Sequence, residues 1–241
     1  MRILLGSGGL STEERRKAWR DAFEAFLGKV ERVLFVPWAL EDHDGYVRMM
    51  VERGFTAGRA LDSIHRAKDP KAAVRDAQAV LVGGGNTGRL LDRVQKAGVL
   101  PLLRRRVAAG LPYVGISAGT NLACPSIRTT NDMPICELRS TAALGLVPFQ
   151  INAHFTDGAY FIRHGARYRP YGGETREVRL LEFLEENPGP VLALREGAIL
   201  HVEGTKARLV GPGGGRLYAR GKPPRDLAPG LDVSFLLRAK R

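Results

Sequence analysis

Cysteine is scarce in this sequence, which has only Cys124 and Cys136 among its 241 residues. Two thiols are too few for a disulfide framework, and we expect both to be reduced packing residues. The five histidines are scattered, and none stands at metal-ligand spacing from a cysteine or another histidine. The composition therefore predicts a fold held by its hydrophobic core and a chemistry that requires no metal and no other cofactor.

Long apolar runs are missing as well. No window approaches the roughly 20 apolar residues that a helix needs to span a bilayer. Segment 1–5 reaches glycine too soon to be a signal peptide, so we expect a cytoplasmic protein without a membrane partner. Hydrophobic residues make up 44% of the chain, and no repeat or linker divides it. We expect one domain over residues 1–241.

Acidic residues are outnumbered, because the chain has 37 Lys and Arg against 25 Asp and Glu, a formal net charge of +12. A basic surface attracts phosphate, which suggests nucleic acid as a partner. The basic residues are spread along the chain, however, with small groups at 104–106, 163–169 and 238–241, and no nucleic-acid-binding motif connects these groups. We therefore expect a solvated basic surface and no nucleic-acid partner. An inactive, basic nucleic-acid-binding protein is the alternative from another class.

Short apolar segments alternate with amphipathic ones through most of the chain. The apolar segments lack the polar alternation of a half-buried strand, which favours parallel strands covered on both faces. We expect strands at 2–6, 32–37, 59–65, 79–82, 113–115, 146–154 and 191–194. Helices are expected between them, the first of which is capped by Ser11. The predicted fold class is α/β, with a mostly parallel central sheet flanked by helices on both faces.

The C-terminal end has a different pattern, in which short apolar segments are separated by glycine turns. We expect these segments to form short antiparallel strands. They cover 198–202, 207–210, 216–218 and 233–237. Segment 222–225, Lys-Pro-Pro-Arg, is predicted to be a surface loop.

The chain is organised around Gly115-Ile116-Ser117-Ala118-Gly119, which follows a short apolar strand. In a Gly-x-Ser-x-Gly elbow, a strand turns tightly into a helix and the serine hydroxyl projects outward near helix-terminal N–H groups. Ser117 is therefore a candidate nucleophile. Because the same five-residue pattern also occurs in ordinary loops, the interpretation depends on what other residues lie nearby.

Several turns are expected to meet Ser117, since the carboxyl ends of parallel strands lie at one edge of a sheet. Segments 6–9 and 83–87 and residue Trp38 all follow predicted strands. In segment 83–87, Gly-Gly-Gly-Asn-Thr, the N–H of Gly85 or of its neighbour is a candidate oxyanion donor that would act together with the N–H of Ala118. The alternative is an ordinary strand-to-helix turn that needs positive φ.

His154 also ends an apolar strand. A lone histidine is more often a structural residue than a base. A serine nucleophile, however, needs an imidazole that accepts its proton, and the position of His154 after a strand favours this role.

Four segments together resemble a known family. They are Ser-Ala-Gly-Thr-Asn-Leu-Ala-Cys-Pro-Ser-Ile-Arg-Thr-Thr-Asn-Asp-Met-Pro-Ile at 117–135, Val-Gly-Gly-Gly-Asn-Thr at 82–87, Ile-Asn-Ala-His-Phe-Thr at 151–156 and Gly-Glu-Thr-Arg-Glu at 173–177. This sequence resembles peptidase E, the alpha-aspartyl dipeptidase of the serine peptidase family that also contains cyanophycinases. The similarity extends from the first strand to about Val210. It implies a flavodoxin-like or class I amidotransferase-like fold, a small peptide substrate with N-terminal aspartate, and a possible homodimer.

The resemblance implies roles for individual residues. Ser117 matches the nucleophile of the family and His154 its general base, while Gly85 and Ala118 match the backbone donors of its oxyanion hole. A glutaminase-type amidotransferase also has a nucleophile elbow in an α/β sheet. Its nucleophile is cysteine, and Ser117 therefore speaks against that class.

The third member of the triad has two candidates, Asp132 and Glu196. Asp132 lies in the Asn-Asp-Met-Pro segment, and Glu196 in the turn after the strand at 191–194. Either carboxylate can orient an imidazole if it reaches Nδ1. We favour Glu196, because its strand is expected beside those that carry Ser117 and His154. Asp132 would then support its own turn.

The resemblance also implies substrate contacts. Arg176 matches the arginine that binds the carboxylate of an N-terminal aspartate, and Asn86 and Thr87 are further substrate-binding candidates. In isolation Arg176 would be interpreted as a surface residue at the start of a helix.

The sequence departs from the family pattern at Ile116, Thr120 and Ala153 and in the region of His43 and Asp44. Its basic segment 157–172 is longer than in the family, and one hypothesis places it over the pocket. A broader aminopeptidase or a cyanophycinase-like enzyme is therefore the alternative to strict aspartyl specificity.

Overall fold

A computed structural model of the chain describes residues 1–158 and 160–238. Its strands are β1 (Arg2–Gly6), β2 (Arg32–Val36), β3 (Ala60–Ser63), β4 (Val80–Val82), β5 (Tyr113–Ile116), β6 (Gln150–Phe155), β7 (Phe161–His164), β8 (Arg167–Pro170), β9 (Val191–Arg195), β10 (Ile199–Glu203), β11 (Lys206–Val210), β12 (Gly215–Ala219) and β13 (Lys222–Leu227). Its helices are α1 (Glu13–Leu27), α2 (His43–Glu52), α3 (Pro70–Asp76), α4 (Thr87–Lys96), α5 (Leu100–Ala108), α6 (Ala118–Leu122) and α7 (Arg176–Glu186), with 3₁₀ turns η1 (Ile64–Arg66) and η2 (Ser234–Arg238).

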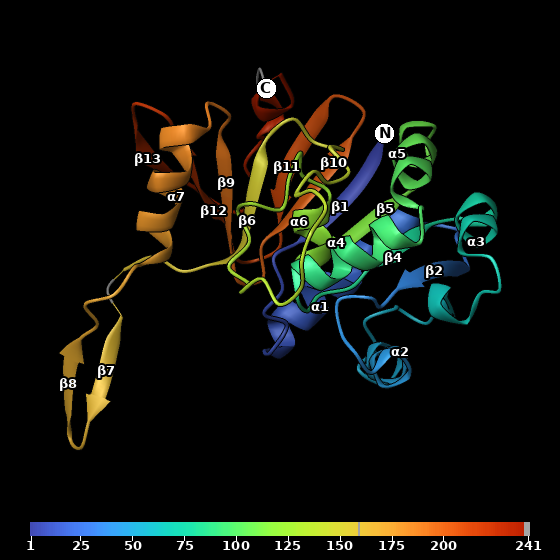
Figure 1. Cartoon of the computed structure of the whole chain (residues 1–241), viewed down its shortest axis with the longest axis horizontal. Coiled ribbons are helices and arrows are strands. Elements are labelled where there is room, and N and C mark those ends of the chain that lie inside the picture. Colours follow the sequence, from blue (N-terminus) through green and yellow to red (C-terminus); the bar gives the residue numbers. More distant parts are fainter. Residues whose placement is uncertain (159, 239–241) are drawn as a thin grey trace.

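The larger sheet has seven strands in the order β11-β10-β1-β5-β4-β2-β3 (Figure 1). Strands β1 to β5 pair in parallel, whereas β10 and β11 join one edge antiparallel. The mostly parallel central sheet and the antiparallel C-terminal strands predicted from the sequence are therefore confirmed. The parallel strands bring the turns after β1, β4 and β5 to one edge of this sheet.

Helices cover both faces of the larger sheet because each strand sends alternate apolar side chains to opposite sides. On β1, Ile3 and Leu5 join the buried cluster that includes residues of α3 to α6, whereas Leu4 joins the cluster under α1 and α2. Trp19 of α1 is fully buried on that second side. The larger sheet is thus held between two apolar layers, which fix the strand ends that carry the site.

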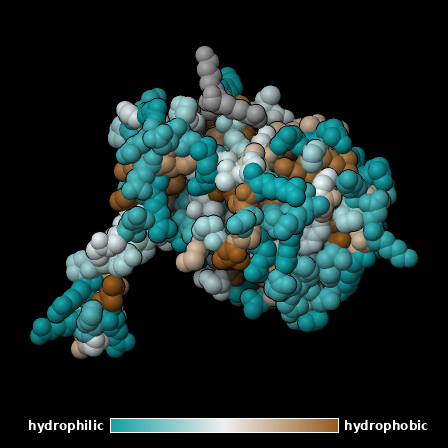
Figure 2. All heavy atoms as spheres, viewed as in Figure 1, coloured by the Kyte–Doolittle hydropathy of each residue, from teal (hydrophilic) through white to brown (hydrophobic). Residues whose placement is uncertain are grey.

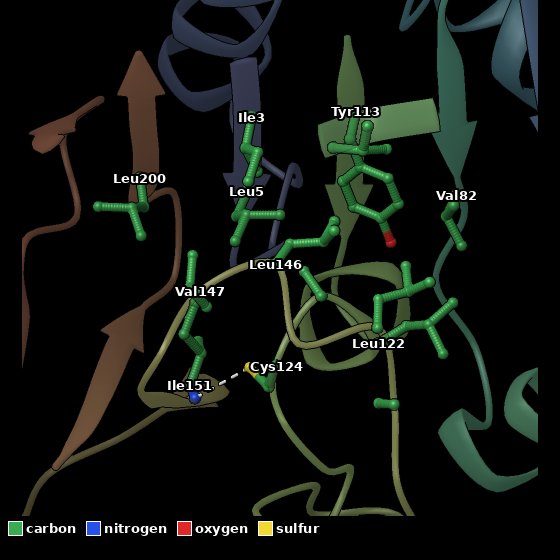
Figure 3. Packing of buried hydrophobic residues seen from close by; sticks show 14 of the residues in the cluster. Ile3, Leu5, Val82, Tyr113, Leu122, Cys124, Leu146, Val147, Ile151 and Leu200 are labelled. Atoms are coloured by element: carbon green, nitrogen blue, oxygen red, sulfur yellow. Dashed lines mark hydrogen bonds between the residues drawn. The ribbon is translucent and has the colours of Figure 1, made fainter. Parts of the chain in front are cut away.

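The smaller sheet has four strands in the order β13-β12-β9-β6. Strands β6 and β9 pair in parallel within it, so the strands that precede His154 and Glu196 are neighbours. The prediction that β9 lies in the sheet that carries Ser117 is wrong in this detail. The two sheets meet through the core, where the N–H of Ile151 on β6 donates to the buried Cys124 Sγ at 3.2 Å (Figure 3).

Two C-terminal predictions are wrong. Segment 222–225 forms part of β13, an edge strand, where Pro223 and Pro224 are tolerated because one side of the strand needs no ladder donor. Segment 233–237 lies largely in the 3₁₀ turn η2 instead of a strand, and the N–H of Ser234 donates to Asp232 Oδ1 at 2.8 Å there. Local side-chain bonding of this kind competes with strand pairing.

The first helix begins one residue later than predicted. Thr12, and not Ser11, is its N-cap, and Thr12 Oγ1 accepts from the N–H of Arg15 at 3.3 Å. Thr12 has the extended backbone conformation that a cap requires.

The basic segment 157–172 contains the hairpin β7–β8, which turns through Gly165 and projects away from both sheets instead of lying over them (Figure 1). Its strands are exposed along their whole length. Within the described residues, no helix is both long enough and apolar enough to cross a membrane.

Candidate active site

Ser117 occupies the turn between β5 and α6. Its backbone has φ 55° and ψ −108°, a conformation that a non-glycine residue adopts only under constraint. The constraint is a hydrogen bond in which its N–H donates to Gly6 O of the adjacent β1 at 2.9 Å. The elbow predicted from the five-residue motif is therefore present, and it directs the hydroxyl away from the sheet edge.

His154 lies at the end of β6, and its side chain reaches the serine. Its Nε2 is 2.8 Å from Ser117 Oγ, and its Nδ1 is 2.8 Å from Glu196 Oε1. Because a carboxylate only accepts hydrogen bonds, Nδ1 carries the proton in the neutral ring and Nε2 accepts from the serine hydroxyl. The three side chains thus form one hydrogen-bonded line from hydroxyl to carboxylate.

Glu196 follows β9 and is partly buried beside the imidazole. The hydrogen bond from His154 lowers the pKa of this carboxyl, burial opposes the shift, and the charges of His154, Arg15 and Arg176 add to it. Glu196 is therefore ionised at neutral pH and can stabilise a protonated imidazole. Gly9 allows this approach, since a Cβ there would lie 1.5 Å from Glu196 Oε2.

Asp132, the rival candidate, makes other contacts. Its Oδ2 accepts from the N–H of Thr87 at 2.7 Å, from Thr87 Oγ1 at 2.6 Å and from Thr130 Oγ1 at 3.0 Å. Thr87 is the first residue of α4, so the carboxylate binds one of the free N–H groups at that helix end. The geometry places Glu196 on His154 and Asp132 at the start of α4.

The glycine loop between β4 and α4 lies against the serine. A Cβ on Gly84 would be 3.0 Å from Ser117 Cβ and 3.5 Å from its Oγ. In the described part of the chain, neither the N–H of Gly85 nor that of Ala118 makes a hydrogen bond. Both predicted oxyanion donors are therefore unengaged next to Ser117, as an oxyanion hole requires.

Two supporting residues were missed from the sequence. Tyr46 of α2 is buried, and its hydroxyl oxygen accepts from the N–H of Gly84 at 2.6 Å. Burial raises the pKa of Tyr46 to about 12, so its phenol is neutral. Ser7 is fully buried after β1, and its Oγ accepts from the N–H of His154 at 2.8 Å and donates to Leu194 O at 2.9 Å.

Their signals in the sequence differ. Ser7 stands in the 6–9 turn at the end of a predicted strand, a position that pointed to the site without giving the residue a role. Tyr46 has no such signal, because it lies within a helix where an aromatic residue is ordinary core.

The predicted substrate-binding residues have different settings. Asn86 caps α4, since its Oδ1 accepts from the N–H of Arg89 at 2.9 Å while its Nδ2 donates to Met133 O at 2.9 Å. Thr87 is fully buried and bonded to Asp132. Arg176 begins α7, and its Nη1 is buried without a hydrogen-bond partner among the described residues. Arg176 is thus the member of this group with a free donor.

A cavity of about 530 Å³ adjoins Glu196 on the side of α1. Arg15 and Arg195 line it, and Arg195 is paired with Asp157 at 2.5 Å. Arg15 Nη1 donates to Gly9 O at 3.2 Å. Arg15 therefore brings a second guanidinium, besides that of Arg176, close enough to act on the Glu196 carboxylate.

A hydroxyl, an imidazole and a carboxylate in line, beside two free backbone N–H groups at the strand ends of an α/β fold, form the constellation of a serine hydrolase. A sequence profile described as peptidase family S51 matches residues 2–210. The chain belongs to peptidase family S51 and is a serine peptidase.

Individual relatives extend this likeness over most of the chain. Peptidase E of Streptomyces coelicolor is 50% identical over 219 residues, which cover 90% of this chain and 86% of that protein. A Drosophila melanogaster protein named probable alpha-aspartyl dipeptidase is 43% identical over 227 residues, or 94% of this chain and 91% of its own length.

A solved structure gives the same fold. The crystal structure of a peptidase from an acI-B1 Actinobacterium superposes with a TM-score of 0.66 at 16% identity, covering 97% of this chain and 96% of that one. At this level of identity the likeness concerns the fold alone.

Proposed function

We propose that this serine peptidase is a dipeptidase that removes N-terminal aspartate from Asp-Xaa substrates, with Ser117, His154 and Glu196 as its triad. The observation that carries the proposal is the hydrogen-bonded line in which His154 is 2.8 Å from both Ser117 Oγ and Glu196 Oε1. The names of two relatives, peptidase E and alpha-aspartyl dipeptidase, support the substrate class.

The first half of the reaction forms an ester. Ser117 Oγ attacks the scissile carbonyl carbon as His154 Nε2 takes the hydroxyl proton, and the carbonyl oxygen becomes an oxyanion. The N–H groups of Gly85 and Ala118 stabilise that charge. The C–N bond then breaks, the leaving amine takes the proton from His154, and the aspartyl group remains on Ser117.

The second half restores the enzyme. His154 takes a proton from water, whose oxygen attacks the ester carbonyl, and the new oxyanion lies between the same two N–H groups. When the intermediate collapses, Ser117 Oγ leaves and regains a proton from His154. Glu196 stabilises the imidazolium in both halves and keeps the ring in its working orientation.

Arg176 supplies the aspartate specificity. Its Nη1 is buried and has no hydrogen-bond partner among the described residues, so this donor is available to a ligand. A substrate carboxylate would complete this hydrogen bond, and a guanidinium can bind it at two points. Asn86 and Thr87 hold the start of α4 and act on the substrate through the glycine loop instead of by direct contact.

A panel of dipeptides with Asp, Glu, Asn, Ala or Arg before leucine tests the proposal. We expect kcat/KM to be highest for Asp-Leu, and Ser117→Ala to reduce it by about 10⁴-fold or more. Arg176→Gln should raise KM for Asp-Leu and leave Ala-Leu unchanged. The matched control is Arg179→Gln on the same helix, since Arg179 is exposed and paired with Glu174. Equal rates across the panel would favour a broader aminopeptidase.

The remaining parts of the proposal concern context. We place the enzyme in the cytoplasm, as one domain over residues 1–241 and as a possible homodimer without a nucleic-acid partner. The buried cluster that joins both sheets supports the single domain. Sedimentation and a duplex-binding titration against salt concentration address the two partner statements.

A further inference from the structure

The arm, defined as residues 160–171 with the hairpin β7–β8, extends into solvent from the base of α7 (Figure 1). An isolated two-stranded hairpin is only marginally stable in water. The arm nevertheless exposes large apolar side chains, among them Phe161 at 59% and Tyr168 at 67% exposure. Exposed apolar groups gathered on one small element indicate a surface that another molecule covers.

The arm also has a pronounced charge. Its cross-strand register pairs Arg163 with Tyr168 and Ile162 with Arg169, which distributes cations over both faces of the hairpin. None of Arg163, Arg167 and Arg169 forms an ion pair within the described residues. The arm therefore exposes aromatic rings together with guanidinium groups that have no carboxylate partner among the described residues. Its chemistry fits a partner surface that is both apolar and acidic.

Helix α7 presents such a surface. Val178, Leu181, Glu182 and Glu185 are exposed and follow the i, i+3, i+4, i+7 spacing of one helix face. The opposite face carries the buried Leu180 and Leu184. Glu174 and Glu177 are paired with Arg179 and Arg216, but Glu182, Glu185 and Glu186 have no ion pair in the part of the chain that the structure describes.

The arm of one molecule cannot cover its own α7, because it leaves the base of that helix and points away from it (Figure 1). In the space-filling view, hydrophobic spheres lie among hydrophilic ones both on the arm and over α7 (Figure 2). Each molecule thus carries a basic, aromatic arm and an acidic, apolar helix face side by side. A two-fold axis would let both pairs of surfaces meet at once.

We propose that two copies of this chain associate by exchanging arms, so that the arm of each lies on the α7 face of the other. Phe161, Arg163 and Tyr168 share one face of the hairpin, so the two rings would cover Val178 and Leu181 while Arg163 would face the glutamates of α7. Arg167 and Arg169 lie on the other face and add to the positive charge of the arm. The inference rests on the homodimer proposed above and names its interface, and it is independent of the peptidase specificity.

Two charge-reversal variants test the exchange by sedimentation at physiological ionic strength. One carries Arg163→Glu, Arg167→Glu and Arg169→Glu, and the other carries Glu182→Arg, Glu185→Arg and Glu186→Arg. Each variant alone should weaken dimerisation by about tenfold or more, because the arm and the α7 face then carry charge of the same sign. Mixing the two should restore a dimer, since the acidic arm meets the basic helix and the basic arm meets the acidic helix.

The control variant Lys29→Glu, Arg48→Glu and Arg53→Glu makes the same change of charge at exposed positions elsewhere, and should leave the dimer intact. A wild-type dimer that both reversals leave unchanged overturns the arm exchange while keeping the dimer. A monomeric wild-type chain overturns both, and in that case binding to anionic vesicles or duplex DNA would identify the other partner of the arm. Hydrolysis of Asp-Leu by each variant reports separately on the peptidase proposal.

Discussion

Asp132 and Glu196 differ in whether closeness to Ser117 along the chain matches closeness to the imidazole of His154 in space. Asp132 belongs to the long motif 117–135 that begins with Ser117, yet its side chain binds the start of α4. Glu196 lies in a short turn far along the chain, yet its Oε1 is 2.8 Å from His154 Nδ1. Nearness to Ser117 in sequence did not decide which carboxylate reaches the imidazole of His154.

The difference follows from topology. Strand β9 is a parallel neighbour of β6, so the turns that end these strands lie together and bring Glu196 to His154. The segment around Asp132 instead crosses the first turn of α4, where a carboxylate is stabilised by free N–H groups. Asp132 therefore holds the start of α4 next to the glycine loop, and Glu196 holds the imidazole of His154.

The largest expected difference between Asp132 and Glu196 is the loss of kcat when each carboxylate is replaced by its amide. Glu196→Gln should lower kcat for Asp-Leu by about 10⁴-fold, because an amide cannot stabilise imidazolium and can impose the wrong tautomer. Asp132→Asn should lower kcat by less than about tenfold. Steady-state kinetics on the folded variants, with circular dichroism as the control for folding, measures both. If Asp132→Asn had the larger effect on kcat, the assignment of the triad would be wrong.

The two variants should rank in the opposite order when stability is measured, with Asp132→Asn losing more stability than Glu196→Gln. Asp132→Asn keeps the shape of the side chain but removes the charge that accepts three hydrogen bonds, so the free energy of unfolding should fall by about 1–3 kcal/mol. Urea unfolding of the two variants and the wild-type chain makes the comparison. An Asp132→Asn protein as stable as the wild type would remove the structural role.

Tyr46 binds the glycine loop at Gly84, whereas Asp132 binds Thr87 at the other end of the loop. Tyr46→Phe keeps the ring against Phe35 and leaves the N–H of Gly84 without its acceptor. We expect kcat to fall by about tenfold with little change in KM, since the loop acts on the transition state. Tyr218→Phe is the matched control, because Tyr218 is a buried ring of the smaller sheet. Equal effects of the two variants would indicate a general loss of stability.

Much of the fold could be predicted from the sequence, because apolar strands and capped helices are local patterns. The parallel direction of β1 to β5 could be predicted because these strands lack polar alternation, and the elbow at Ser117 because of its glycines. Strand β13 could not be recognised, since two prolines oppose strand formation unless the strand lies at an edge. Membership of β6 and β9 in a second sheet depends on long-range pairing that no local pattern encodes.

The site divides in the same way. Ser117, His154 and the glycine loop were recognisable because each follows an apolar strand. Ser7 and Tyr46 were not, since their role is a single hydrogen bond to the backbone of a residue distant in sequence. The choice between Asp132 and Glu196 likewise required the positions of His154 Nδ1 and the start of α4.

The smallest expected effect concerns pH. The pKa of Glu196 lies below its ordinary value of 4.5 because His154 donates to the ionised carboxylate. A lowered pKa in the folded state means that the interaction stabilises the protein above that ordinary value and is lost as pH falls through the folded pKa. The free energy of unfolding should therefore fall more for the wild-type protein than for Glu196→Gln when the pH is lowered from neutral to below the folded pKa of Glu196. Urea unfolding at both pH values measures the difference, and parallel losses in the two proteins would mean that Glu196 is not ionised against His154 in the folded state.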